Sequence, residues 1–284
     1  MCLTPHRPAA PTIIHWSPSD RRFPPEIPIA TPSHLLLSPS FGWLVAEPLR
    51  AAFDYARIRL TDGHRFHAGD GHAVVFFPGL GADERYMSRL KVHCQQLGYA
   101  CYDWGRGFNT GPEGNLKTWI GKLAAEVEAL VGEHAQSVTL IGWSLGGIYA
   151  REIAKILTTR VRQVITLGSP FGGVADSTNA AWLYRLLNGT EAPSSEAFSR
   201  NLRSPPPVPT SSIYSRSDGV VAWRSCQMKV GPRAENIEVD SSHLGLVFHH
   251  KVFNVVANRL AQRLGEWKPW RDASVSLPVR AFAA

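Results

Sequence analysis

One serine lies between small residues at the point where a short apolar run gives way to apolar residues at helical spacing. The motif G-x-S-x-G spans residues 142–146 and is centred on Ser144. The apolar run 137–141 before it predicts a short buried strand, and the apolar residues after it recur at helical spacing. The pattern alone arises by chance in about one chain in ten of this length. A strand before and a helix after are typical of a nucleophilic serine on a strained turn. The alternative is a tight turn that glycines merely make possible.

A serine hydroxyl is a weak nucleophile unless a base accepts its proton. A nucleophile on such a turn is followed along the chain by an acid and then by a histidine. Of the three histidines after Ser144, His243 lies in a polar turn directly after a predicted strand. His249 and His250 fall within a predicted helix, where we expect them to face solvent or pack. We therefore predict that His243 is the base, with an ordinary loop histidine as the alternative.

The acid should follow the strand before the one that leads to His243, because loops at that edge of an open α/β sheet build active sites. Asp218 lies in such a loop and would orient the imidazole and stabilise its protonated form. Asp240 is the second choice because it stands at a strand end, and Glu238 and Asp176 are further competitors.

Two backbone N–H groups are needed to stabilise the oxyanion that forms during acyl transfer. Leu145, the residue after the serine, supplies one. We expect Leu80 to supply the other, because Gly79 and Gly81 allow a backbone turn after an early predicted strand. A plain glycine-rich turn is the alternative. A phosphate-binding loop is less supported, since neither GxGxxG nor GxxxxGK occurs.

Strands and helices alternate along most of the chain, which predicts a mostly parallel sheet with helices on both faces. We expect a domain over 34–270, after a proline-rich arm at 1–33 and before an irregular tail at 271–284. The predicted strands are 72–79, 99–105, 137–143 and 161–170, and the alternation returns later with the segments 211–219 and 236–242. The predicted helices are 41–60 (interrupted at Pro48), 83–97, 115–133, the one after Ser144, and 244–263.

The alternation stops over residues 171–209, which we interpret as an insertion and a candidate lid. It contains a predicted apolar helix at 180–187, from which Trp182, Tyr184 and Leu186 are candidate contacts for an acyl group. The alternative is that this helix simply packs onto the domain. Asn109, in the loop 104–112, is a further candidate substrate contact.

Composition excludes several other classes of protein. The chain has 284 residues and a formal net charge of +7, but its basic residues are scattered and no nucleic-acid motif occurs, so we predict no nucleic-acid partner. No apolar stretch is long enough to span a bilayer. The N-terminus has no signal-peptide core, although a transit peptide remains an alternative.

The four cysteines show no metal-ligand spacing, and we predict reduced thiols in a cytoplasmic protein. A Cys94–Cys101 bridge would require export. The spacing of His64, His67 and His72 matches no strong metal pattern, and we expect these histidines to be solvated. No metal and no cofactor is predicted.

Five segments together resemble successive blocks of the α/β-hydrolase superfamily, and more narrowly its lipase-like bacterial members. They are PGLG at 78–81, GWSLGG at 142–147, LGSPFGG at 167–173, YSRSDGVV at 214–221 and SSHLGL at 241–246, within a resemblance that covers about residues 70–262. Pro78 is a departure, since lipases commonly have histidine before the oxyanion glycine. This weakens a specifically triacylglycerol-lipase interpretation and leaves the three side chains untouched.

The resemblance implies an acyl-enzyme mechanism with Ser144 as nucleophile, Asp218 as acid and His243 as base, and with Leu80 and Leu145 as oxyanion donors. We predict a hydrolase of small-molecule or lipid carboxylic esters with an apolar acyl group. Acyl transfer through the same groups and a non-catalytic binding protein on the same fold are the alternatives. Contact of the basic chain and its 41–60 helix with a membrane surface is also open.

Overall fold

The computed structural model describes residues 39–58, 69–132, 137–172 and 196–271. These residues belong to a compact unit, Leu36–Ala284. The predicted arm at 1–33 and nearly all of the predicted tail at 271–284 lie outside the described residues, as does the predicted helix at 180–187.

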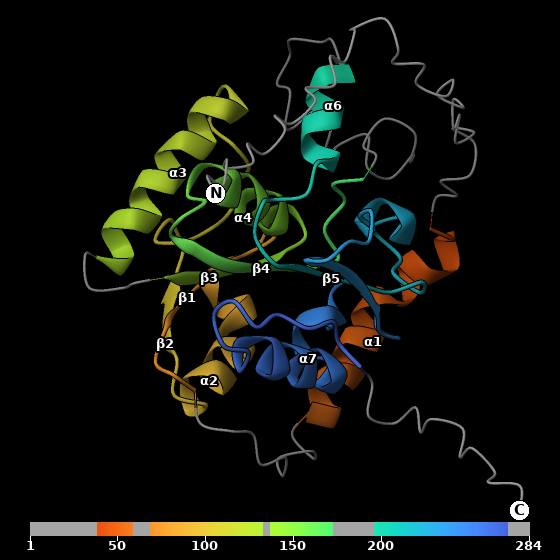
Figure 1. Cartoon of the computed structure of the whole chain (residues 1–284). Helices are drawn as coiled ribbons and strands as arrows, with labels where there is room; N and C mark the ends of the chain where they lie inside the picture. Colours follow the sequence, from red (N-terminus) through yellow and green to blue (C-terminus); the bar gives the residue numbers. More distant parts are fainter. Residues whose placement is uncertain (1–38, 59–68, 133–136, 173–195, 272–284) are drawn as a thin grey trace, which may run out of the picture. The chain divides into compact units, whose positions relative to one another are not determined.

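A six-stranded sheet forms the centre of the described unit (Figure 1). Its order is β2-β1-β3-β4-β5-β6, and every neighbouring pair is parallel. The carboxyl ends of all these strands therefore lie at one edge. The strands are β1 Ala73–Phe77, β2 Ala100–Asp103, β3 Val138–Trp143, β4 Val161–Leu167, β5 Thr210–Tyr214 and β6 Ala234–Glu238.

Helices cover both faces of the sheet, as predicted. Helices α3 and α4 pack on one face, and α2 and α7 on the other (Figure 1). The helices are α1 Phe41–Ile58, α2 Ser88–Gln96, α3 Leu116–Val131, α4 Leu145–Ile156, α6 Glu196–Arg203 and α7 His250–Leu260, with short 3₁₀ turns η3 Glu84–Met87, η4 Trp223–Cys226 and η5 Gly245–Phe248.

The central strands are apolar on both sides because each side faces a layer of helices. Successive side chains of a strand point to opposite faces. Val75 accordingly packs in the layer of α3 and α4, whereas its neighbour Val74 packs in the layer of α2 and α7. This alternation makes near-continuous apolar runs the signature of buried parallel strands.

Two predicted helices differ from the observed ones. Helix α1 continues through Pro48, which was expected to interrupt it. Proline removes one backbone N–H donor, and the buried Glu47 and Ala51 on either side of it hold the helix against the protein. The predicted helix at 244–263 is divided into η5 and α7, because His249 has an extended backbone between them (φ −79°, ψ 127°). His249 is buried and packs against His250.

Helix α6 lies in the insertion and was not predicted. It is attached to α4, since the fully buried Arg151 donates hydrogen bonds to the backbone oxygens of Leu202 (3.3 Å) and Ser204 (3.1 Å). The returning part of the insertion is thus held on the outside of the helix that begins after Ser144.

Helix α1 has an unusual distribution of polar and apolar residues. Glu47 and Asp54 are buried against the protein. The opposite face exposes four large apolar side chains spaced four residues apart, Phe41, Val45, Leu49 and Phe53. An ordinary surface helix presents the reverse arrangement.

The described cysteines Cys94, Cys101 and Cys226 are free thiols. Cys94 of α2 and Cys101 of β2 are close enough for their thiols to share a hydrogen bond. Among the described residues, no helix is long and apolar enough to cross a membrane.

Candidate active site

Ser144 lies where β3 ends and α4 begins. Its backbone has φ 53° and ψ −122°, and it is the one non-glycine residue of the described chain with a positive φ. A side chain in this region of backbone space is strained, and such strain persists where the surrounding structure imposes it. Here the Ser144 N–H donates to the Leu167 carbonyl oxygen of β4 (2.8 Å), which fixes the turn against the neighbouring strand.

The glycines of the motif are required by close backbone approach. A Cβ atom at Gly142 would lie 2.4 Å from the Gly146 carbonyl oxygen, and one at Gly146 would lie 2.2 Å from the Phe77 carbonyl oxygen of β1. Both distances are well inside van der Waals contact. The turn therefore admits only glycine at these positions unless the backbone moves.

Ser144, His243 and Asp218 are joined by two hydrogen bonds at the carboxyl edge of the sheet. The distance from His243 Nε2 to Ser144 Oγ is 3.1 Å, and that from His243 Nδ1 to Asp218 Oδ2 is 2.7 Å. The three residues come from the turns after β3, β6 and β5. The arrangement can draw a proton from the serine hydroxyl and stabilise the imidazolium that results.

All three residues are buried. The pKa of His243 is raised above its usual 6.5: burial lowers it, but the charge of Asp218, the hydrogen bond to Asp218 and the charge of Glu47 together raise it by more. Burial and the charge of Asp218 also raise the pKa of the Cys226 thiol. The imidazole is therefore adapted to hold a proton once it has received one.

The competing acids occupy other positions. Asp240 has a side chain that is 92% exposed and accepts a hydrogen bond from Ser217 Oγ (2.7 Å). Glu238 pairs with Arg216 and Tyr214. Asp176 lies outside the described residues. Asp218 is held in place by two further bonds, because its Oδ1 accepts the N–H groups of Val220 (2.9 Å) and Val221 (2.7 Å).

The loop after β1 lies directly beside the serine. A Cβ atom at Gly79 would be 3.0 Å from Ser144 Cβ, so only a small residue fits at this approach. The next residue is Leu80. Within the described chain, neither the Leu80 nor the Leu145 backbone N–H donates a hydrogen bond. Both N–H groups therefore stay candidates for the predicted oxyanion donors.

The side chain of Asn109 is buried, contrary to the prediction. It was expected to contact substrate, but it has no exposed surface and its groups bond within the protein. Its side-chain amide donates to the Pro78 carbonyl oxygen (2.8 Å), and its backbone carbonyl oxygen accepts the Gly81 N–H (2.9 Å). These bonds flank Leu80 on both sides. Asn109 therefore fixes the Leu80 loop. The other predicted substrate contacts, Trp182, Tyr184 and Leu186, lie outside the described residues.

Sequence reasoning missed the groups that support the His243 loop. Trp143 Nε1 donates to the His243 carbonyl oxygen (3.1 Å), and Tyr86 stacks on Trp143 and donates to the Leu244 carbonyl oxygen (3.0 Å). The buried Glu47 accepts three backbone N–H groups from the loops that carry His243 and Asp218. No motif signals such a residue, because its partners are far away in the sequence.

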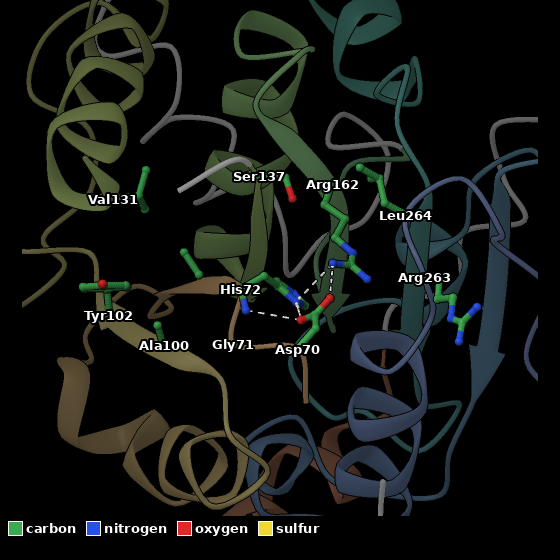
Figure 2. A pocket seen from close by; sticks show the side chains of 11 residues that line it. Asp70, Gly71, His72, Ala100, Tyr102, Val131, Ser137, Arg162, Arg263 and Leu264 are labelled. Atoms are coloured by element: carbon green, nitrogen blue, oxygen red, sulfur yellow. Dashed lines mark hydrogen bonds and ion pairs between the residues drawn. The ribbon is translucent and has the colours of Figure 1, made fainter. Parts of the chain in front are cut away.

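A second polar cluster lies at the opposite edge, where the strands begin. Asp70, His72 and Arg162 are joined to one another there (Figure 2). All three line a cavity of about 590 Å³. His72 Nε2 is 2.9 Å from Thr139 Oγ1, which produces a second carboxylate–imidazole–hydroxyl chain. Thr139 is fully buried, so this hydroxyl cannot reach a substrate.

The predicted solvation of His72 is wrong, since its side chain is only 7% exposed. Asp70 and Thr139 hold the ring in place of water. His64 and His67 lie outside the described residues. The described residues contain no group of three or more His, Cys, Asp or Glu side chains that could hold a metal ion.

Comparisons with known proteins agree with this architecture. Lipase B of Aspergillus fumigatus superposes with a TM-score of 0.52 at 15% identity, over 70% of this chain and 55% of that one. The Pyrococcus furiosus esterase Pf2001 gives 0.51 at 16% identity, over 69% and 84%. Identities this low show a shared fold alone. No curated protein matches the chain in sequence. The model of the alpha/beta hydrolase family matches residues 74–277, which is most of the chain, and the chain belongs to that family.

Proposed function

We propose that the protein is a serine hydrolase that cleaves carboxylic esters with an apolar acyl group. The observation that carries this proposal is the pair of hydrogen bonds linking Asp218, His243 and Ser144 on a strained strand-to-helix turn. The backbone N–H groups of Leu80 and Leu145, which donate no hydrogen bond to the described residues, would add the electrostatic stabilisation that acyl transfer needs.

In the proposed reaction His243 Nε2 removes the hydroxyl proton as Ser144 Oγ attacks the ester carbonyl carbon. The carbonyl oxygen becomes an oxyanion between the N–H groups of Leu80 and Leu145. The imidazolium, stabilised by Asp218, then gives its proton to the leaving alcohol, and an acyl-enzyme remains. Water then attacks the acyl-enzyme ester while His243 Nε2 removes one of its protons. The imidazolium returns this proton to Ser144 Oγ as the acyl C–O bond breaks, and the carboxylic acid departs.

The test is a pre-steady-state measurement with p-nitrophenyl esters of two to twelve carbons in the acyl chain. The proposal predicts a burst of one p-nitrophenol per protein molecule, higher kcat/KM for longer acyl chains, and loss of the burst in Ser144→Ala. A burst that survives this substitution contradicts the proposal.

Acyl transfer would use the same acyl-enzyme with an alcohol or amine in place of water. Product analysis with added alcohol separates the two reactions, since a hydrolase releases mainly the free acid. A non-catalytic binding protein would retain affinity for the ester without turnover. The hydrogen-bonded chain of Ser144, His243 and Asp218 supports catalysis over binding alone.

We further propose that lipid esters are reached through peripheral contact of α1 with a membrane surface. The outward row of Phe41, Val45, Leu49 and Phe53 supports this, because an apolar helix face of this kind can enter the headgroup region. Sedimentation with anionic vesicles at low and high salt is the test. We expect Leu49→Glu to lower the bound fraction at both salt concentrations, and binding unaffected by this charge would refute the contact.

The cytoplasmic location suggested by the cysteines is likewise a proposal, which cell fractionation tests.

A further inference from the structure

The buried carboxylate of Glu47 contacts the loops of both predicted catalytic partners. Its Oε1 accepts the backbone N–H groups of Gly219 (2.7 Å) and His243 (2.9 Å), and its Oε2 accepts that of Leu244 (2.9 Å). The residue is only 2% exposed. Gly219 directly follows Asp218, so one side chain joins the acid loop to the base loop. Three N–H donors suit an ionised carboxylate, which accepts and cannot donate.

We propose that Glu47 is a positioning residue that holds Asp218 and His243 in hydrogen-bonding register and favours the protonated imidazole during turnover. The proposal rests on the proposed function, because it assigns Glu47 a role in that same reaction. Glu47 does not touch the reacting atoms. It acts through the backbone N–H of His243, whose imidazole touches them.

The orientation of α1 supports a role beyond attachment of the helix. A helix that served only to cover the core would turn its apolar face inward. In α1 the apolar face is outward, and the inward face brings Glu47 and Asp54 against the loops. The contact is close, since a Cβ atom at Gly219 would lie 2.5 Å from the Trp43 carbonyl carbon. The family match begins at residue 74, so this helix lies outside the matched part of the chain.

The charge of Glu47 acts on groups around it. It is one of the influences that raise the pKa of His243, after burial, which lowers it, and the charge and hydrogen bond of Asp218. Burial and then the charge of Glu47 raise the pKa of Tyr86, which faces it from η3.

Other charged groups of this region have partners of their own. On α1, Asp54 accepts a hydrogen bond from Ser241 Oγ (2.8 Å), and Arg50 binds Ser217 and pairs with Asp240. Cys226 faces Asp218 from η4. None of these groups bonds to the backbone of His243.

Two substitutions distinguish the effect of the Glu47 charge from the effect of its side-chain length. Glu47→Gln keeps the length but has one acceptor oxygen. If that oxygen takes the two-donor position, the amide group faces the Leu244 N–H, donor against donor. Glu47→Asp keeps the charge but is one methylene shorter and cannot span both loops. Ala51→Gly is the matched control, because it weakens the same buried face of α1 without removing a charge.

The experiment measures the pH dependence of kcat and KM for each variant, together with an NMR titration of the His243 imidazole. For Glu47→Gln we expect kcat to fall about 10-fold to 100-fold with KM changed less than about 3-fold. We expect the His243 pKa and the acidic limb of kcat/KM to fall by about 0.5 pH unit. For Glu47→Asp we expect a similar fall in kcat with a smaller pKa change. For Ala51→Gly we expect a lower melting temperature with the acidic limb unmoved.

Several results would overturn the proposal. An unchanged His243 pKa in Glu47→Gln refutes the electrostatic role, and wild-type kcat in Glu47→Asp refutes the positioning role. The same is true if Ala51→Gly shifts the acidic limb as much as Glu47→Gln does. The NMR titration does not depend on turnover. A lowered His243 pKa in a protein without Ser144-dependent hydrolysis therefore supports the Glu47 contact while the proposed function fails.

Discussion

The Asp218→Asn substitution tests the catalytic assignment because it should change which nitrogen of His243 carries the imidazole proton. Asp218 Oδ1 is fixed by the N–H groups of Val220 (2.9 Å) and Val221 (2.7 Å). In the asparagine variant the carbonyl oxygen takes that position, because only an acceptor fits there. The amide nitrogen then faces His243 Nδ1, at the place where a carboxylate oxygen lies 2.7 Å away in the native protein.

An amide N–H beside Nδ1 makes that nitrogen an acceptor, so the imidazole proton moves to Nε2. Nε2–H cannot receive the Ser144 proton, and the base is lost with the fold preserved. We expect kcat to fall by roughly 10⁴-fold. This equals about 5 kcal/mol of transition-state stabilisation.

The assay compares kcat for a p-nitrophenyl ester near pH 8 with melting temperatures for the same samples. Asp240→Asn is the matched control, because this acid stands in the neighbouring loop with a side chain that is 92% exposed. We expect its kcat to stay within about 2-fold of the native value, as for most exposed charges. Asp218→Asn retaining more than a tenth of native kcat, or Asp240→Asn losing more than the Asp218 variant, would refute the assignment.

Three further predictions follow. The acidic limb of kcat/KM should have its midpoint above pH 6.5, because the base must be neutral and the His243 pKa is raised. A pH–rate profile checks this. The same pKa shift contributes folding stability that is fully present below pH 6.5 and is lost as pH rises through the folded-state pKa. Gly146→Ala should destabilise the fold by at least about 3 kcal/mol in urea unfolding, since its Cβ atom would lie 2.2 Å from a backbone oxygen. Gly121→Ala in α3, with open space around it, should instead stabilise by up to about 1 kcal/mol, and equal effects of the two would contradict this explanation. Asn109→Ala should lower kcat about 10-fold with little change in KM, because it loosens the Leu80 loop, which is proposed to bind the oxyanion. A change in KM alone would instead support direct contact of Asn109 with substrate.

The sequence was sufficient to predict the strands and the positions of Ser144, Asp218 and His243. Each follows a segment that predicts a strand, and parallel strands must end at the same edge. Residues in the loops after such strands are therefore brought together by topology alone. The hydrogen bonds between the three side chains are what the structure adds.

Glu47 and Asn109 show what could not be predicted. Glu47 contacts residues 172 and 196 positions away, and an isolated acid in a helical pattern gives no indication of such partners. The loop of Asn109 was placed at the correct edge, but the direction of its side chain depends on turn geometry that no pattern records. The division of the last helix at His249 was missed because apolar residues continue at helical spacing through the break.

Ser144 is proposed to be a nucleophile activated by His243. The most direct measurement is the intact mass of the protein after reaction with a fluorophosphonate, beside Ser144→Ala and His243→Ala. We expect one adduct per native chain, on the peptide that contains Ser144. We expect no adduct in the serine variant and a much slower reaction in the histidine variant. An unmodified native protein, or an adduct that persists in Ser144→Ala, would contradict this proposal.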